Sequence, residues 1–156
     1  MSLLLAVLGV EIGGASGAIF TSQGLASWYG TLEQPALAPP NWVFGPVWTA
    51  LFALMGVALW LVWRQAEAPS PTDRRARVAL AVFGGQFALN LAWSAAFFGA
   101  QSVGLGLAVI ALLWIAIAAT IWAFARVDPR AGALLGPYLV WVSFAAYLNY
   151  GFWVLN

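Results

Sequence analysis

Long apolar runs separated by short polar segments make up this sequence. Residues 3–24 are interrupted only by Glu11, residues 41–63 carry no charge, and residues 78–125 form 48 uncharged positions in a row. A helix needs about 20 mostly apolar residues to cross a bilayer, so the third run is long enough for two helices. The runs therefore predict five membrane-spanning helices, at residues 3–24, 41–63, 75–98, 102–125 and 130–155.

The composition supports the same conclusion. Of the 156 residues, 63% are hydrophobic and 7% are charged, and the mean hydropathy is +0.90. A soluble domain carries roughly 25% charged residues, so water cannot cover most of this surface. We predict an all-α integral membrane protein, a five-transmembrane-helix bundle that forms one domain over residues 1–156. Residues 2–10 also fit a signal peptide, but no Lys or Arg precedes them, which favours a retained first span.

Residues with known preferences for helix ends mark the boundaries. Asn41 is a candidate N-cap of the second helix, and Ser102 is a candidate N-cap of the fourth. A capping residue followed by proline opens the third helix at Ser70-Pro71 and the fifth at Asp128-Pro129. Gly136-Pro137 lies inside the fifth span and predicts a kink there.

All six arginines fall on one side of a five-helix topology. The N-terminus, residues 64–77 and residues 126–130 share that side, while the 25–40 loop and the C-terminus lie on the other. Loops rich in Arg stay in the cytoplasm. We therefore expect a protein surrounded by lipid, with a cytoplasmic N-terminus and with the first loop and the C-terminus outside. The arginines are Arg64, Arg74, Arg75, Arg77, Arg126 and Arg130.

The residue types that are absent from the sequence exclude several kinds of functional site. The chain has neither Cys nor His, which excludes disulfides, thiolate nucleophiles and the commonest zinc and haem ligands. Its net charge of +1 does not suggest a nucleic-acid surface. We expect no metal site, no required cofactor and no nucleic-acid partner.

The stretch from Trp28 to Trp48 differs from the apolar runs on both sides. It holds four prolines, four Trp or Tyr residues and one charge, Glu33. Each proline fixes φ and removes a backbone donor, which predicts a stiff loop. Because aromatic side chains prefer the membrane interface, we expect this loop to form a lid there.

Polar and aromatic residues share one stripe of the third helix. Gln86, Asn90, Trp93 and Phe97 follow the spacing i, i+4, i+7 and i+11, which places them on one face. An unpaired amide is costly in hydrocarbon, so this face should point into the bundle. The amides would then either contact a ligand or form hydrogen bonds between helices.

Two other helices carry related residues. The fifth has Trp141, Ala145 and Asn149 at i, i+4 and i+8, and the second adds Trp48 and Phe52. Together with the third helix, these residues could line an aromatic cavity suited to a flat apolar ligand.

The first helix combines a glycine ladder with an acid. Gly9, Gly13 and Gly17 are four residues apart and allow close helix packing, either within the bundle or across a dimer. Glu11 points away from this ladder. An ionisable residue inside a span is a candidate for proton transfer or for contact with polar partners.

Seven short motifs occur in order along almost the whole chain: Trp28-Tyr29, APPNWVF at 38–44, PVWT at 46–49, Gln86, NLAWS at 90–94, FFG at 97–99 and PYLVWVSFA at 137–145. They resemble the motifs of the TspO/MBR family, the tryptophan-rich sensory proteins related to the mitochondrial translocator protein. The resemblance implies five transmembrane helices and porphyrin binding, with sterols and benzodiazepine-type drugs bound by some members. Members of the family often form homodimers, and the resemblance to its bacterial and archaeal members implies a prokaryotic plasma (inner) membrane.

The resemblance also implies a ligand pocket under the first loop. Trp48 and Trp141 resemble the pair linked in some bacterial members to light-dependent breakdown of protoporphyrin, and Phe52 stands where Tyr is frequent. Residues 148–150 begin the sterol-recognition pattern of relatives, but no Lys or Arg follows them, which argues against sterol binding through that pattern. The implied pocket residues are Tyr29, Pro39, Trp48, Phe52, Asn90, Trp93, Trp141 and Ala145, and the stripe on the third helix adds Gln86.

These features favour a membrane-embedded sensor or binding protein for porphyrin-type ligands. The absence of His favours a metal-free porphyrin over haem. The pocket offers no general acid or base, so we do not expect a conventional enzyme. Two alternatives remain: transport of porphyrin or another apolar solute, and light-dependent porphyrin degradation through Trp48 and Trp141.

Overall fold

The computed structural model describes residues 1–67 and 73–156, and these residues form helices and no strand. As the sequence predicts, five spans are long and apolar enough to cross a membrane. They consist of α1 (Leu3–Ser27), α2 (Phe44–Glu67), α3 (Asp73–Ser94), α4 (Val103–Ala125) and a fifth span that contains α5 (Pro129–Leu134) and α6 (Gly136–Leu155).

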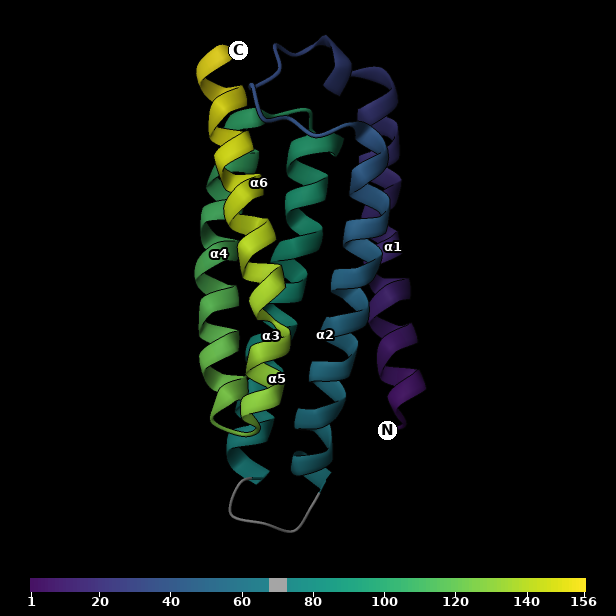
Figure 1. Cartoon of the computed structure of the whole chain (residues 1–156), viewed down its shortest axis with the longest axis vertical. Coiled ribbons are helices and arrows are strands. Elements are labelled where there is room, and N and C mark those ends of the chain that lie inside the picture. Colours follow the sequence, from purple (N-terminus) through teal and green to yellow (C-terminus); the bar gives the residue numbers. More distant parts are fainter. Residues whose placement is uncertain (68–72) are drawn as a thin grey trace.

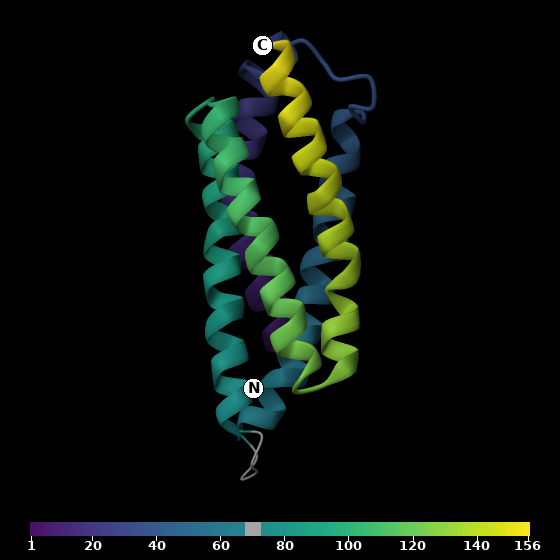
Figure 2. The ribbon, with the colours of Figure 1, turned by 90° about the vertical axis from the view of Figure 1, so that its left-hand side faces the viewer.

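The helices form an elongated bundle with the two termini at opposite ends (Figure 1). Helix α1 packs against α2 and α3, α3 packs against α4, and α4 packs against α6. In the turned view, α4 lies in front of α3, and α6 lies in front of α2 (Figure 2). The bundle therefore closes around side chains from α2, α3, α4 and α6, while α1 covers one side of it.

Two of the predicted helix caps are confirmed. Ser102 Oγ accepts a hydrogen bond from the backbone N–H of Leu105 at 3.2 Å, at the start of α4. Asp128 Oδ1 accepts one from the backbone N–H of Arg130 at 2.9 Å, with Pro129 in the first turn of α5. Both caps satisfy backbone donors that have no partner inside the helix.

The predicted cap at Asn41 is wrong. Asn41 is the first residue of a 3₁₀-helix, η2 (Asn41–Val43), that leads into α2, and its side chain makes no capping hydrogen bond. Pro40, in extended conformation, occupies the cap position, and its carbonyl accepts from the N–H of Val43 at 3.0 Å. The pair Ser70-Pro71 lies outside the described residues.

The predicted interruption of the fifth span is confirmed. Helix α5 ends at Leu134, and α6 begins at Gly136. Pro137 has no N–H to donate, so the i to i−4 ladder cannot run unbroken through this point. The C-terminal end of α3 also departs from α-helical geometry, because Ala95–Gly99 form a π-helix, η3, that buries Phe97 and Phe98.

The first loop is fixed to the end of α6. The backbone N–H of Glu33 donates to Asn156 Oδ1 at 2.9 Å, and Asn156 Nδ2 donates to the Glu33 carbonyl at 3.2 Å. Buried Pro35 packs against Gly151, where a side chain would collide with the proline ring. The stiff loop predicted from its prolines is therefore also tied down by contacts.

The glycine ladder is used mainly inside the bundle. A side chain at Gly13 would meet the ring of Phe87, and one at Gly17 would meet Leu91, both on α3. Gly9 has no atom within 4 Å of the place where a Cβ would sit. Two of the three glycines thus let α1 approach α3 closely.

Candidate functional site

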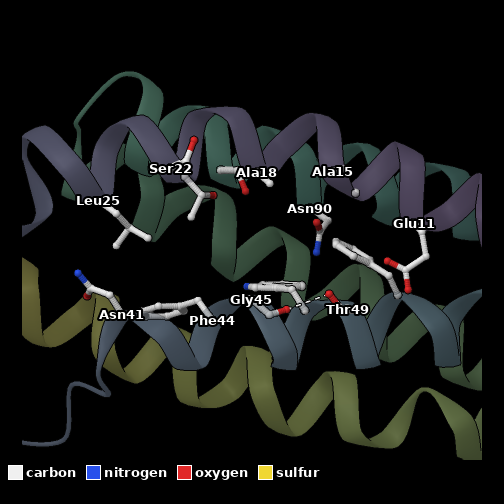
Figure 3. Close-up of a pocket in the computed structure, with 15 residues that line it drawn as sticks. Glu11, Ala15, Ala18, Ser22, Leu25, Asn41, Phe44, Gly45, Thr49 and Asn90 are labelled. Carbon is white, nitrogen blue, oxygen red and sulfur yellow. Dashed lines mark hydrogen bonds between the residues drawn. The ribbon is translucent and has the colours of Figure 1, made fainter.

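A cavity of about 300 Å³ lies between α1 and α2 (Figure 3). Exposed residues on both helices border it, including Ala15 and Ala18 on α1 and Gly45 and Thr49 on α2. The cavity is therefore open on the side of the bundle that faces the bilayer. Its lining consists of Glu11, Gly14, Ala15, Ala18, Thr21, Ser22, Leu25, Asn41, Phe44, Gly45, Trp48, Thr49, Phe52, Asn90 and Ser94.

Aromatic rings form the α2 wall of this cavity. Trp48 and Phe52 are stacked, with ring centroids 5.4 Å apart and an interplanar angle of 29°. The Phe52 ring occupies the space that a side chain at Gly14 would need, so the glycine on α1 admits the ring. Phe44 lies one helical turn before Trp48 and continues the same face. The wall offers a flat apolar surface against which a ring system could stack.

An amide on α3 reaches the cavity and is held by a buried hydrogen-bond chain. Asn90 Nδ2 donates to the hydroxyl of Tyr138 at 2.7 Å, and that hydroxyl donates to Gln86 Oε1 at 3.0 Å. All three residues are buried. Within the described residues, no group donates to Asn90 Oδ1, so its oxygen can accept from a ligand. The chain fixes the direction in which Asn90 presents this acceptor.

A second cavity lies under the first loop but is almost filled. Its volume is about 20 Å³, close to the space that one water molecule needs. The ring of Tyr29 is buried there, with its centroid 5.1 Å from that of Phe152 and 5.9 Å from that of Phe98. This cavity is lined by Tyr29, Phe44, Trp93, Phe97, Phe98, Ala145, Leu148, Asn149 and Phe152.

The structure divides the predicted pocket residues among three places. Of the nine, three line the α1–α2 cavity, three line the small cavity under the loop, and three line neither. The residues predicted for one pocket under the loop are therefore spread over two cavities that share only Phe44, and over positions outside both. In that order the groups are Trp48, Phe52 and Asn90, then Tyr29, Trp93 and Ala145, then Pro39, Gln86 and Trp141.

The residues outside both cavities have other contacts. Gln86 accepts a hydrogen bond from Tyr138 and so joins α3 to α6. A hydrogen bond between helices is one of the two roles that the sequence leaves open for the amides. Trp141 packs edge-on against Phe44 at 6.2 Å between ring centroids. Asn149, which lines the small cavity, also joins helices, because its Oδ1 accepts from Trp93 Nε1 at 3.2 Å and its Nδ2 donates to the carbonyl of Val103 at 2.9 Å.

Sequence reasoning missed the contribution of α1. Glu11 stood out only as an ionisable residue, and the small residues from Gly14 to Ala18 were not linked to a cavity. The sequence does contain a signal for this cavity. One span carries a run of small side chains and the next span carries large rings, and two such helices leave space between them when they pack together. Phe44 was also overlooked, although it precedes Trp48 and Phe52 at the spacing i, i+4 and i+8.

Five spanning helices around a buried core, with a cavity open towards the bilayer, define an α-helical integral membrane protein. The model of the TspO/MBR family matches residues 5–154, and the chain belongs to this family.

The sequence is similar to those of known proteins over most of their length. The chain is 47% identical to the tryptophan-rich protein TspO of Chlorobaculum tepidum, over 92% of this chain and 88% of the relative. It is 43% identical to the translocator protein of Homo sapiens, over 81% and 73% of the two chains. It is 40% identical to the tryptophan-rich sensory protein of Cereibacter sphaeroides, over 83% and 77%.

Proposed function

We propose that this protein binds a flat apolar ligand of the porphyrin type in the α1–α2 cavity. The observation that carries the proposal is the cavity itself, which brings Trp48, Phe52 and Asn90 together. These three residues come from α2 and α3, and the sequence predicts all three as ligand contacts. Membership of the TspO/MBR family supports the same ligand class, as the motifs suggested.

The geometry fits a ring system that enters from the membrane. The stacked pair of Trp48 and Phe52 supplies the apolar face, and Asn90 Oδ1 supplies an acceptor for an N–H group. A volume of about 300 Å³ is at the lower end of the range for ligand pockets, so a larger ring would extend through the open side. An apolar ligand dissolved in the bilayer reaches this opening without crossing water.

Titration of the purified protein with protoporphyrin, followed by porphyrin fluorescence, tests the proposal. We expect Trp48→Ala to weaken binding about tenfold, because the stacking face and its buried area are lost. Trp122→Phe is the matched control, since Trp122 is exposed on α4 away from the cavity. Equal affinities of Trp48→Ala and wild-type protein would contradict the proposed site.

The distribution of charge supports an orientation in the membrane. All six arginines belong to the end of the bundle that holds the N-terminus, where the amino group of Met1 lies 3.3 Å from Glu67 Oε2. This supports a cytoplasmic N-terminus, with the first loop and the C-terminus outside. The similarity to the protein of Chlorobaculum tepidum supports a prokaryotic inner membrane. A homodimer, which the family resemblance suggests, would have to pack without Gly13 and Gly17, because these already contact α3.

A further inference from the structure

The carboxyl group of Glu11 lies at the end of the α1–α2 cavity that is farther from the first loop. We call this the inner end of the cavity. Glu11 is four residues from the midpoint of α1, or about 6 Å along the helix axis, so it is well inside the span. Its side chain points into the space between α1 and α2 (Figure 3). The other four acids of the chain lie in loops or at helix ends.

This carboxyl group has no partner in the part of the chain that the structure describes. Within residues 1–67 and 73–156, no hydrogen bond or salt bridge reaches Glu11. None of the six arginines lines the cavity. An acid held inside a membrane span without a counter-charge is costly, and such residues usually serve a ligand, an ion or a proton.

The surroundings of Glu11 indicate the chemistry of a partner. The cavity continues from the carboxyl group along Phe52 and Trp48, which present apolar ring faces. A carboxylate attracts a cation or a hydrogen-bond donor and repels another carboxylate. Ring faces favour a flat apolar body and also attract a positive charge close to them.

We propose that the α1–α2 cavity is a site for amphiphilic amines, molecules that carry a protonated nitrogen on a flat apolar body, with Glu11 as the counter-ion. The amine lies at the Glu11 end, and the apolar body lies against Trp48 and Phe52. The inference rests on the proposed function, because it requires that ligands enter this cavity. It adds an orientation to that function, since any ligand carboxylate is kept away from the inner end.

Three pyrene derivatives of nearly equal size form the test: 1-pyrenemethylamine, 1-pyrenemethanol and 1-pyrenecarboxylate. Binding to the purified protein in zwitterionic nanodiscs is measured by energy transfer from tryptophan to pyrene. We expect the wild-type protein to bind the amine on the order of tenfold more tightly than the alcohol, because a charge-assisted hydrogen bond is gained, and to bind the carboxylate most weakly.

The variant Glu11→Gln keeps the shape of the side chain and removes its charge. We expect it to bind the amine and the alcohol with affinities within about twofold of each other, because the charge-assisted hydrogen bond to the amine is lost. Glu33→Gln, which removes an exposed acid in the first loop, is the control for net charge and should keep the preference. Glu11→Asp, which keeps the charge, should retain part of it.

Three results would overturn the inference: equal binding of amine and alcohol by wild-type protein, an unchanged preference in Glu11→Gln, or no binding of any pyrene probe. The protoporphyrin titration separates these failures from failure of the proposed function. If protoporphyrin binds in a manner that depends on Trp48 but the amine preference is absent, only the role of Glu11 is wrong. If protoporphyrin binding does not depend on Trp48, the cavity itself is misassigned.

Discussion

The buried residues Gln86, Asn90 and Tyr138 form one chain of hydrogen bonds between α3 and α6. The spacing of Gln86, Asn90 and Trp93 correctly predicts that one stripe of α3 faces inward, because an amide cannot be left unpaired in lipid. Spacing does not identify the partner. The hydroxyl of Tyr138 joins Asn90 and Gln86, and this depends on the rotation of α6 about its own axis, which the pattern of one helix does not contain.

The variant Tyr138→Phe tests this chain of hydrogen bonds. It leaves the Asn90 donor and the Gln86 acceptor without their partner, and we expect a loss of about 1–2 kcal/mol in the free energy of unfolding. We also expect weaker protoporphyrin binding, because Asn90 is no longer held in one direction. Unfolding in detergent with increasing denaturant provides the measurement.

Tyr147→Phe is the matched control for that variant, since Tyr147 is half exposed on the same helix. Its stability should equal that of the wild-type protein. Equal stability of Tyr138→Phe and Tyr147→Phe would show that the chain contributes nothing to the fold.

The choice of neighbouring helices explains why the observed cavities differ from the predicted pocket. The sequence identifies five spans and their inward faces, but it does not show which helices are neighbours. Helix α1 carries no large aromatic stripe, so it was not expected to line a pocket. Its small residues, among them Gly14, nevertheless leave the space that becomes the cavity once α2 brings Trp48 and Phe52 alongside.

A close contact between the backbones of α1 and α2 supports a prediction about stability. A Cβ at Gly56 would lie 2.5 Å from the Cα of Val7, so Gly56→Ala must push the two backbones apart. We expect a loss of about 1–3 kcal/mol in the free energy of unfolding, which is typical of an overpacked contact. Because the backbones meet beside the inner end of the cavity, the affinity for protoporphyrin should also change.

Gly9→Ala on α1 provides the comparison for Gly56→Ala. Nothing lies within 4 Å of its added Cβ, and Ala favours the helix over Gly by up to about 1 kcal/mol. Thermal unfolding of both variants in detergent should therefore show opposite shifts. Destabilisation by Gly9→Ala would instead reveal a partner on the outer face of α1.

The whole molecule is polar at one end and capped by a loop at the other. The arginines gather where the N-terminus and the α4–α5 connection lie, and the first loop crosses the opposite end beside the C-terminus (Figure 1). The charge pattern was visible in the sequence because it depends only on the number of spans. The attachment of the first loop to α6 was not visible in the sequence, because it depends on contacts such as those between Glu33 and Asn156.

Single cysteines can test the orientation cleanly, because the chain contains no other cysteine. Ala36→Cys places an exposed thiol in the first loop, and Glu67→Cys places one at the arginine-rich end. Arg-rich segments are retained on the cytoplasmic side during insertion, so a membrane-impermeant maleimide added to intact cells should label Ala36→Cys and spare Glu67→Cys. After permeabilisation both variants should be labelled, which shows that each thiol is accessible. Labelling of Glu67→Cys alone in intact cells would contradict the proposed orientation, because it would place the arginine-rich end outside and the first loop in the cytoplasm.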